Sequence, residues 1–267
     1  MKRTKNSLRL TNLVLVLVFT LSSCSDTDGV EIVTQVSPTF NFTHNWNSQS
    51  VTSSDFNNIQ FTNENGEILS IERLRYVISD ITFRSTSGEE LVLDGYNLVD
   101  LTNSNGLSYM IDTQIPIGNY TNVSFTFGLD NEDNAENYLD LNSASFNVPD
   151  MLGGGYHYMQ FDGKYLDTNA NEQGFNYHAI RAVDNPGANP TFPQDTFFTV
   201  NLGPIAVTNN SQIEVKVNLA EWFKSPNIWD LNTLNQMLMP NSSAQIMMYE
   251  NGQSVFSLGL VSESIDN

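Results

Sequence analysis

The sequence predicts an all-β protein, an antiparallel β-sandwich of about eight to ten strands with short helical turns. Apolar and polar residues alternate in many short segments, which is the period-two pattern of half-buried strands. Clusters of Asn, Asp, Gly and Ser separate these segments, as turns do in sandwiches and barrels. No internal repeat or second boundary interrupts the pattern, so residues 38–262 are expected to form one domain with a short tail at 263–267.

The expected strands follow one another along the whole domain. Two of the segments are long enough for a pair of strands, and Asn-Gly, a strong signal for a two-residue hairpin turn, occurs in both, at 65–66 and 251–252. Short helical turns are expected at 70–76 and 229–239. The segments expected to form strands are 40–46, 59–85, 91–101, 121–129, 155–163, 175–183, 196–203, 212–223 and 244–261.

Residues 1–23 have the pattern of a secretory signal peptide. The first nine residues, MKRTKNSLR, are basic, and an apolar run follows that is shorter than the about 20 residues of a membrane-spanning helix. The sequence LSSC, which ends at Cys24, resembles a bacterial lipobox, in which the cysteine is lipidated and becomes the new N-terminus. Plain secretion with a chance cysteine is the alternative.

Lipidation at Cys24 would place the protein in the cell envelope, held to the membrane only by its lipid anchor. We expect the outer membrane, on its periplasmic or its surface face. Residues 24–37 would then form the lipidated tether, because this stretch begins polar and acidic and Pro38 closes it.

The charge of the chain excludes one class of partner. The formal net charge is −19, from 11 basic and 30 acidic residues. Four of the basic residues lie in the signal region, so the chain from Cys24 onward carries seven basic and 30 acidic residues, a net charge of −23. Such a surface repels nucleic acid and anionic lipid. With the single cysteine acylated, neither a disulfide nor a thiolate metal site can form.

Two of the three histidines lie in neighbouring predicted strands. His157 is in GYHYMQFDG and His178 is in FNYHAIRAV, and DTNANEQ between them would form the turn of an antiparallel hairpin. If paired positions sum to 335, His157 lies directly opposite His178, with Cβ atoms about 4.5–5.5 Å apart. Two imidazoles at that separation can hold one metal ion, so the sequence predicts a histidine-based metal site here.

The other candidate ligands are His44, in FNFTHNW, and Met159, two residues after His157 in its strand. Imidazole with thioether favours copper, and Cu(I) especially accepts thioether sulfur. The alternative is structural: a histidine on an apolar strand face is often a hydrogen-bonded core residue, and methionine often fills gaps in a core.

An acidic loop, GLDNEDNAENYLDLN at 128–142, is a candidate calcium site. Asp130, Asp133 and Asn134 offer the hard oxygen ligands that Ca²⁺ prefers, although the loop lacks the glycine and glutamate of an EF-hand. The alternative is that Asp130 and Asn134 cap a turn. No nucleophile elbow, phosphate loop or H-E-x-x-H motif occurs, so the sequence predicts a protein that is not an enzyme.

Several segments occur in an order that resembles a known family. LSIERLRYVISDITF, YNLVDL, IPIGNYTNVSFTFGLD, the Gly-Tyr of GGGYHYMQFDG and the His of FNYHAI follow one another along the chain. Together they resemble the MbnP-like copper-binding domain family, the methanobactin-biosynthesis partner type, over most of residues 38–262. The resemblance implies a β-sandwich, an exported location and copper binding through histidine.

The resemblance also bears on individual residues. His178 matches the family's histidine after the glycine-rich strand, His157 follows the Gly-Tyr motif, and His44 lies near the family's N-terminal histidine. Gly128, Asp130 and Asn134 match a recurrent Gly-x-Asp-x-x-x-Asn stretch.

One departure from the family concerns kynurenine. Some members carry a kynurenine that a MauG-like di-haem partner makes from tryptophan. This sequence reads PDMLGG where the family often has tryptophans, so it predicts neither the kynurenine nor the di-haem partner.

These observations lead to two hypotheses. The first is a non-catalytic cell-envelope lipoprotein that binds copper for capture or handling, with an outer-membrane transporter as a candidate partner. The second is a surface β-sandwich for interaction or glycan binding without a metal, in which exposed tyrosines would stack on sugar rings. The tyrosines in question are Tyr156, Tyr158, Tyr165 and Tyr177.

Overall fold

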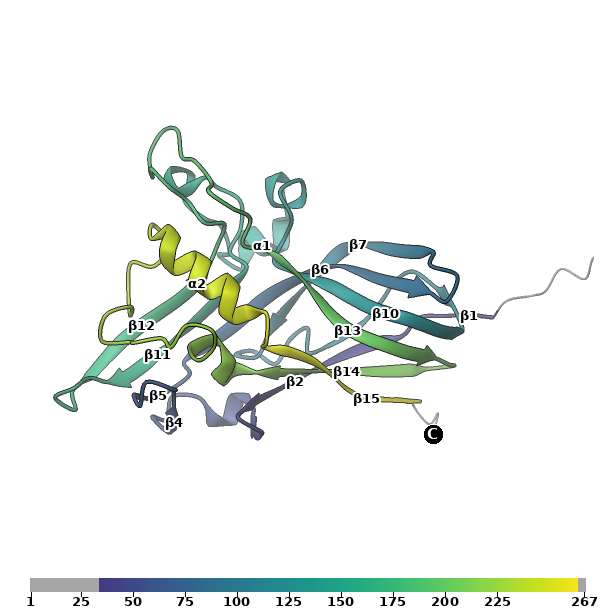
Figure 1. Cartoon of the computed structure of the whole chain (residues 1–267), viewed down its shortest axis with the longest axis horizontal. Helices are drawn as coiled ribbons and strands as arrows, with labels where there is room; N and C mark the ends of the chain where they lie inside the picture. The colour runs from purple at the N-terminus through teal and green to yellow at the C-terminus, as the bar shows by residue number, and fades with distance from the viewer. Residues whose placement is uncertain (1–33, 264–267) are drawn as a thin grey trace, which may run out of the picture. The chain divides into compact units, whose positions relative to one another are not determined.

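Two packed β-sheets form the described part of the protein, residues 34–263 of a computed structural model (Figure 1). The fold is an all-β sandwich, as the sequence predicts. The signal peptide, Cys24, most of the tether and the end of the C-terminal tail lie outside the described residues. Residues Val33–Asn267 form one compact unit.

The larger sheet has eight strands in the order β13-β10-β6-β11-β5-β4, with β12 on β11 and β7 on β6. All of its pairs are antiparallel. Its strands are β4 (Phe61–Thr62), β5 (Ile68–Leu69), β6 (Arg73–Ser85), β7 (Glu90–Asp100), β10 (Gly118–Phe127), β11 (Met159–Leu166), β12 (Glu172–Ala179) and β13 (Phe198–Val207).

The smaller sheet has five strands in the order β15-β14-β2-β3, with β8 on β2, and its β2–β14 pair is parallel. Its strands are β2 (Thr39–Trp46), β3 (Gln49–Val51), β8 (Ser108–Met110), β14 (Ser211–Asn218) and β15 (Phe256–Glu263). A separate pair joins β1 (Gln35–Val36) to β9 (Ile115–Pro116). Nine strands of the described chain have eight or more residues, which agrees with the predicted number, and six have only two or three.

Helical structure is confined to the connections. The helices are α1 (Leu139–Ser143) and α2 (Ser242–Gly252), and the 3-10 turns are η1 (Ser53–Asp55), η2 (Asp133–Ala135), η3 (Asp150–Leu152) and η4 (Leu219–Phe223). Between residues 34 and 263, no helix is both long and apolar enough to cross a membrane.

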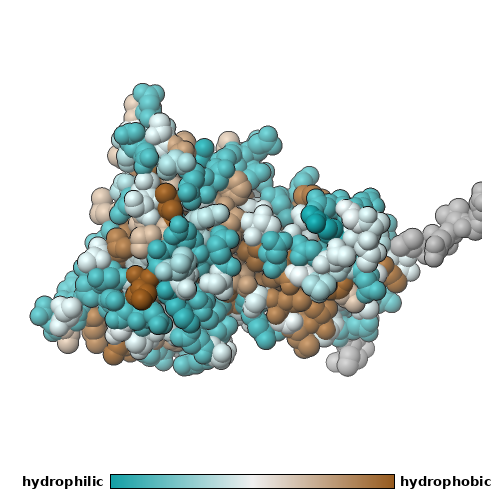
Figure 2. Space-filling model, in the orientation of Figure 1, coloured by the Kyte–Doolittle hydropathy of each residue, from teal (hydrophilic) through white to brown (hydrophobic). Residues whose placement is uncertain are grey.

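Aromatic side chains from both sheets meet in the core. Phe42 of the smaller sheet packs edge-on against Tyr76 and Phe125 of the larger sheet, with 6.3 Å between ring centroids in each pair. Phe256 of β15 packs 5.5 Å from Phe125 and 5.6 Å from Phe127. The strand alternation read from the sequence is therefore the alternation between this core and the outer faces. The outer face in Figure 2 is mainly hydrophilic, with an apolar area near β13–β15.

The prediction of a hairpin at 244–261 is wrong. Residues Ser242–Gly252 form α2, which Asn241 begins by accepting a hydrogen bond from the amide of Ala244. The Asn251-Gly252 pair ends this helix instead of turning a hairpin. Tertiary contacts explain the difference. Asn251 is fully buried, and its side-chain amide donates to the carbonyls of Trp222 and Asn227.

Of the two predicted helical turns, the one at 70–76 is absent, because these residues lead into β6 and Ser70 pairs with Lys164. Long-range pairing has overridden a local helical preference there. At 229–239 a single turn forms, in which the carbonyl of Asp230 accepts from the amides of Thr233 and Leu234, but it does not continue as a helix.

The close approach of β11 to residue 70 generates a test of the packing. A Cβ at Gly163 would lie 2.0 Å from the carbonyl oxygen of Ser70, so Gly163→Ala should lower the free energy of unfolding by about 1–3 kcal/mol. Gly174→Ala, on the neighbouring strand, is the control, because the nearest atom to its Cβ would be the Gln236 amide nitrogen at 3.7 Å. Chemical denaturation measures both, and equal stability of the two variants would contradict this account.

Candidate metal centre

The hairpin of β11 and β12 carries the two histidines, but its register differs from the predicted one. His178 lies opposite Gln160, and Asp162 lies opposite Asn176. The prediction that His157 and His178 are direct partners is therefore wrong. The physical reason is that β11 begins only at Met159, because the chain before it follows a turn of three left-handed glycines at 153–155.

The two imidazole rings nevertheless lie side by side. Their centroids are 5.2 Å apart and their planes are nearly perpendicular, at 84°. Strand alternation breaks at residues 158–159, since Tyr158 and Met159 both enter the hydrophobic core. This break turns His157 to the other face of the sheet, where the side chain of His178 lies. The structure thus brings together the pair that the sequence singles out.

His157 is held with one ring nitrogen free. Its Nδ1 lies 2.7 Å from the carbonyl oxygen of Phe146, and because a carbonyl only accepts, Nδ1 carries the proton and donates. Nε2 then keeps its lone pair. This atom is buried and has no hydrogen-bond partner among residues 34–263. A buried imidazole nitrogen with an available lone pair is the form in which histidine binds a metal.

His178 is oriented by a carboxylate. Its Nε2 lies 2.8 Å from Oδ1 of Asp162, an oxygen that also accepts from Asn176, while Arg73 donates to Oδ2. Burial works to raise the pKa of Asp162, but the hydrogen bond and charge of His178 and the bonds from Asn176 and Arg73 outweigh it and lower the pKa to about 2. Asp162 is therefore ionised and accepts from Nε2, and in the neutral form of His178 the lone pair is then on Nδ1.

The charges around the pair favour a neutral His157. Burial lowers its pKa to about 4, the hydrogen bond to Phe146 opposes this, and His178, Arg73 and Arg75 lower it further. Arg75 donates to Gln160 and lies over the Phe146 ring, 5.1 Å from its centroid. Because two positively charged guanidinium groups act on this site, placing a monovalent cation there costs less electrostatic free energy than placing a divalent one.

The structure does not bring the other two candidate ligands to this pair. His44 Nε2 lies 3.1 Å from the hydroxyl of Tyr76, which in turn pairs with Met159 in the sheet. Tyr76 and Met159 face the core, whereas Gln160 and His178 face the opposite side. The sheet therefore separates His44 and Met159 from the histidine pair. His44 is instead a hydrogen-bonded core histidine.

The acidic loop supports the chain that leads into His157. Asp130 Oδ1 accepts from the amides of Glu132 and Asp133, and its carbonyl accepts from the amide of Asn134, so Asp130 caps the turn of η2. Asn134 Oδ1 then accepts from the amide of Tyr156 at 2.8 Å. The residue before His157 is thus tied to the loop.

Glycine at two positions allows the acidic loop and the segment around His157 to pack closely. A Cβ on Gly155, whose φ is +73°, would lie 2.7 Å from the Asn134 side chain, and one on Gly128, at φ +91°, would lie 2.7 Å from the Tyr158 ring. Gly128 and Asn134, the ends of the Gly-x-Asp-x-x-x-Asn stretch, therefore both pack against the segment around His157. The sequence shows the motif but not its target, because the contact joins residues 22 positions apart.

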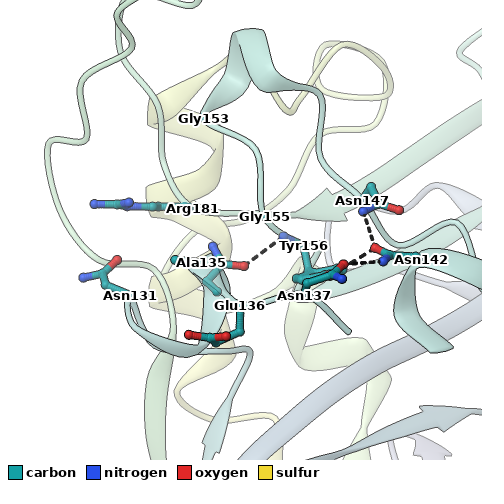
Figure 3. Close-up of a pocket in the computed structure, with 11 residues that line it drawn as sticks. Asn131, Ala135, Glu136, Asn137, Asn142, Asn147, Gly153, Gly155, Tyr156 and Arg181 are labelled. Atoms are coloured by element: carbon teal, nitrogen blue, oxygen red, sulfur yellow. Dashed lines mark hydrogen bonds between the residues drawn. The ribbon is translucent and has the colours of Figure 1, made fainter. Parts of the chain in front are cut away.

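A polar pocket of about 370 Å³ lies beside this support (Figure 3). Asparagine side chains line much of it, and Asn142 links Asn137 to Asn147 through hydrogen bonds. The Tyr156 hydroxyl also donates to Asn142 and accepts from the amide of Tyr138. This network holds the hydroxyl of Tyr156, while Asn134 holds its backbone amide, so the polar groups beside the pocket serve the structure.

Among residues 34–263, no group of three or more His, Cys, Asp or Glu side chains could hold a metal ion. The calcium site at Asp130, Asp133 and Asn134 stays a prediction. Of the alternative, the turn capped by Asp130 is present, whereas Asn134 bonds the distant amide of Tyr156 instead of capping a turn. A metal at the histidine pair would accordingly need ligands beyond those residue types, such as solvent or thioether.

The tyrosine platform predicted for sugar binding is wrong. All four tyrosines are buried, with exposed fractions of 0–3%. Tyr177 packs against Trp229 at 4.5 Å and donates its hydroxyl to the Trp222 carbonyl, as a core residue does. The tyrosines in question are Tyr156, Tyr158, Tyr165 and Tyr177.

Comparisons with known proteins agree with this description. The model of a family described as MbnP matches residues 35–247. Among solved structures, MbnP from Methylosinus trichosporium is similar with a TM-score of 0.51 and 12% identity, over 85% of this chain and 99% of that one. At this identity the likeness concerns the fold alone. No curated protein matches the sequence.

The buried histidines generate a prediction on pH. Burial lowers the pKa of His44 from 6.5 to about 4, so below about pH 6.5 the unfolded chain takes up a proton that the folded chain refuses. The free energy of unfolding should fall as the pH drops from about 6.5 to about 4. In His44→Gln the fall should be smaller by on the order of 2–3 kcal/mol. Urea denaturation at pH 7, 5.5 and 4.5 measures it; an identical fall in both proteins would refute the assignment.

The Asn134 contact generates a second prediction. Asn134→Ala leaves the buried amide of Tyr156 without its acceptor and should lower the free energy of unfolding by about 1–3 kcal/mol. The imidazole NMR signals of His157 should also shift. Asn137→Ala is the control, since Asn137 is exposed and its oxygen accepts only from Asn142. Unchanged His157 signals in Asn134→Ala would mean that the loop does not position this residue.

Proposed function

Because the chain belongs to the MbnP family, we propose that it binds copper through the imidazoles of His157 and His178. The observation that supports this most directly is the pair of perpendicular rings, 5.2 Å apart, in which an acceptor fixes one nitrogen of each. With metal–nitrogen bonds of about 2 Å, one ion would bind both remaining nitrogens if they lie within about 4 Å of each other, and rings 5.2 Å apart permit this.

The residues present fit such an ion. Metal-ligating histidines usually donate their other N–H to a carbonyl or a carboxylate, and here Phe146 and Asp162 supply one of each. The buried Nε2 of His157 has no partner in the described chain, so a metal would satisfy it. Imidazole suits copper, and the nearby Arg73 and Arg75 favour the monovalent ion.

The proposed role is capture or holding of copper, without catalysis. The proposed place is the cell envelope, where a lipid on Cys24 would anchor the domain at the outer membrane, with a transporter in that membrane as candidate partner. The support for this placement is the N-terminal sequence alone: a basic start, a short apolar run and then the single cysteine.

Copper titration of the purified protein tests the proposal. Wild-type protein should bind one Cu(I) per chain in competition with a chromogenic Cu(I) chelator, and His157→Ala/His178→Ala should lose this binding, because both imidazole ligands are gone. We expect an affinity loss of at least about 100-fold in the double variant.

His44→Gln is the matched control, since His44 lies on the opposite face of the sheet and should not affect the stoichiometry. Equal binding in wild type and in the double variant would show that the two histidines are structural. Tight binding that disappears only in His44→Gln would move the site into the core and refute the proposed pair.

A further inference from the structure

Three methionines gather at the edge of the histidine pair. Met151, Met237 and Met239 line one pocket of about 480 Å³ together with His178. We call this the methionine pocket. The chain contains eight methionines, and these three come from segments far apart in sequence, η3 and the stretch that precedes α2. Since His178 belongs to both the pocket and the histidine pair, the two places share a residue.

The methionine pocket is built of soft and apolar groups. Asn176 is its single other polar lining residue, and no carboxylate lines it, although the chain has 30 acidic residues. Hard divalent ions such as Ca²⁺ and Mg²⁺ require oxygen ligands, which a thioether lining does not supply. Thioether sulfur is a soft ligand that Cu(I) accepts.

Two of these methionines are too exposed to be core residues. Met151 is 57% exposed and Met237 is 79% exposed, so neither fills a gap in the interior. Met237 also has a φ of 55°, the left-handed region that side chains other than glycine rarely adopt. Met239 packs against a small apolar cluster around Leu152 and Ile180 and gives the pocket a fixed wall.

Hydrogen bonds fix the methionine-bearing segment against the strand of His178. The amide of Gln245, which is buried, donates to the carbonyls of both Leu238 and His178, at 3.0 and 2.9 Å. The amide of Asn176 donates to the carbonyl of Asn235 at 2.8 Å. The Gln245 side chain and one backbone bond therefore hold the segment with Met237 and Met239 next to the strand of His178.

We propose that the methionine pocket is a thioether site for Cu(I), whose sulfurs bind the ion together with His178, next to the buried Nε2 of His157. This inference rests on the proposed function, and it assigns the pocket a role that the histidine pair lacks. His157 is buried and the pair offers two nitrogen ligands, whereas the pocket is open to solvent and adds sulfur. The ion enters as Cu(I) and stays Cu(I), so no oxidant or reductant is needed.

X-ray absorption and NMR of the purified protein test the thioether site. With one equivalent of Cu(I), the absorption spectrum should contain sulfur scattering besides nitrogen. With one equivalent of Ag(I), a monovalent soft ion without redox chemistry, the ε-methyl signals of Met151, Met237 and Met239 should shift. Met110, 61% exposed on β8, is the internal control and should not shift.

The variant Met151→Leu/Met237→Leu/Met239→Leu keeps the apolar volume and removes the sulfurs. We expect its Cu(I) affinity to fall at least about tenfold and its sulfur scattering to vanish, while Met110→Leu behaves as wild type. If the triple variant does not fold, the Ag(I) shifts in wild-type protein decide alone. Absence of these shifts, or unchanged Cu(I) affinity in a folded triple variant, would overturn the proposal.

The same experiment distinguishes this proposal from the proposed function. If only the methionine site is wrong, Cu(I) binding remains, depends on His157 and His178, and shows nitrogen scattering without sulfur. If only the histidine pair is wrong, Ag(I) still shifts the three methionine methyls in His157→Ala, a residue outside the methionine pocket, and Cu(I) affinity in that variant equals wild type. Loss of both signals overturns both.

Discussion

The candidate metal centre depends on one buried carboxylate. Asp162 accepts hydrogen bonds from Arg73 of β6, Asn176 of β12 and His178 of β12, so it joins three neighbouring strands on one face of the larger sheet. Taking a carboxylate out of water costs several kcal/mol unless its lone pairs are used. Here three hydrogen bonds use these lone pairs and lower the pKa of Asp162 against the effect of burial. The hydrogen bond from His178 also sets the tautomer of that imidazole. One interaction therefore affects both the stability of the fold and the geometry of a candidate ligand.

The polar layer around Asp162 exists because β11 is covered on both faces. In most antiparallel sandwiches one face of a strand meets the core and the other meets water. In β11 the residues from Met159 to Gly163 are all buried. The segment before the strand provides the second cover: Ser145 accepts from Gln160, and Phe146 accepts from both the amide and the ring of His157. His157 can be buried on the outer face of the larger sheet only because this segment covers it.

The fold could be predicted from the sequence to the extent that it depends on local pattern. Each of the nine long strands overlaps a segment that the sequence predicts as a strand, and the hairpin around DTNANEQ follows from turn residues between two such segments. The register of that hairpin could not be derived, since the break in alternation at Tyr158 and Met159 arises from packing in the core. Helix α2 was missed for a related reason: Asn251-Gly252 is a hairpin signal locally, and distant carbonyls decide its conformation. The histidine pair could be predicted because the chain has only three histidines to combine. The grouping of Met151, Met237 and Met239 could not be predicted, because no local sequence pattern links residue 151 to residue 237.

Charge acts on the proposed copper site at two length scales. The chain as a whole is strongly acidic, and such a surface raises the local concentration of cations. Over distances beyond about 8–10 Å this attraction is screened by salt and does not distinguish one cation from another.

At the site itself the nearest carboxylate, Asp162, is already neutralised by Arg73, and Arg75 adds a further positive charge. The proposed ligands there are neutral imidazole and, at the rim, neutral thioether. A second positive charge on a bound ion would be repelled by the nearby guanidinium groups, at a distance where screening is weakest. Under this proposal, preference for a soft monovalent ion would depend on the immediate surroundings of His157 and His178, while the acidic surface would only bring cations near.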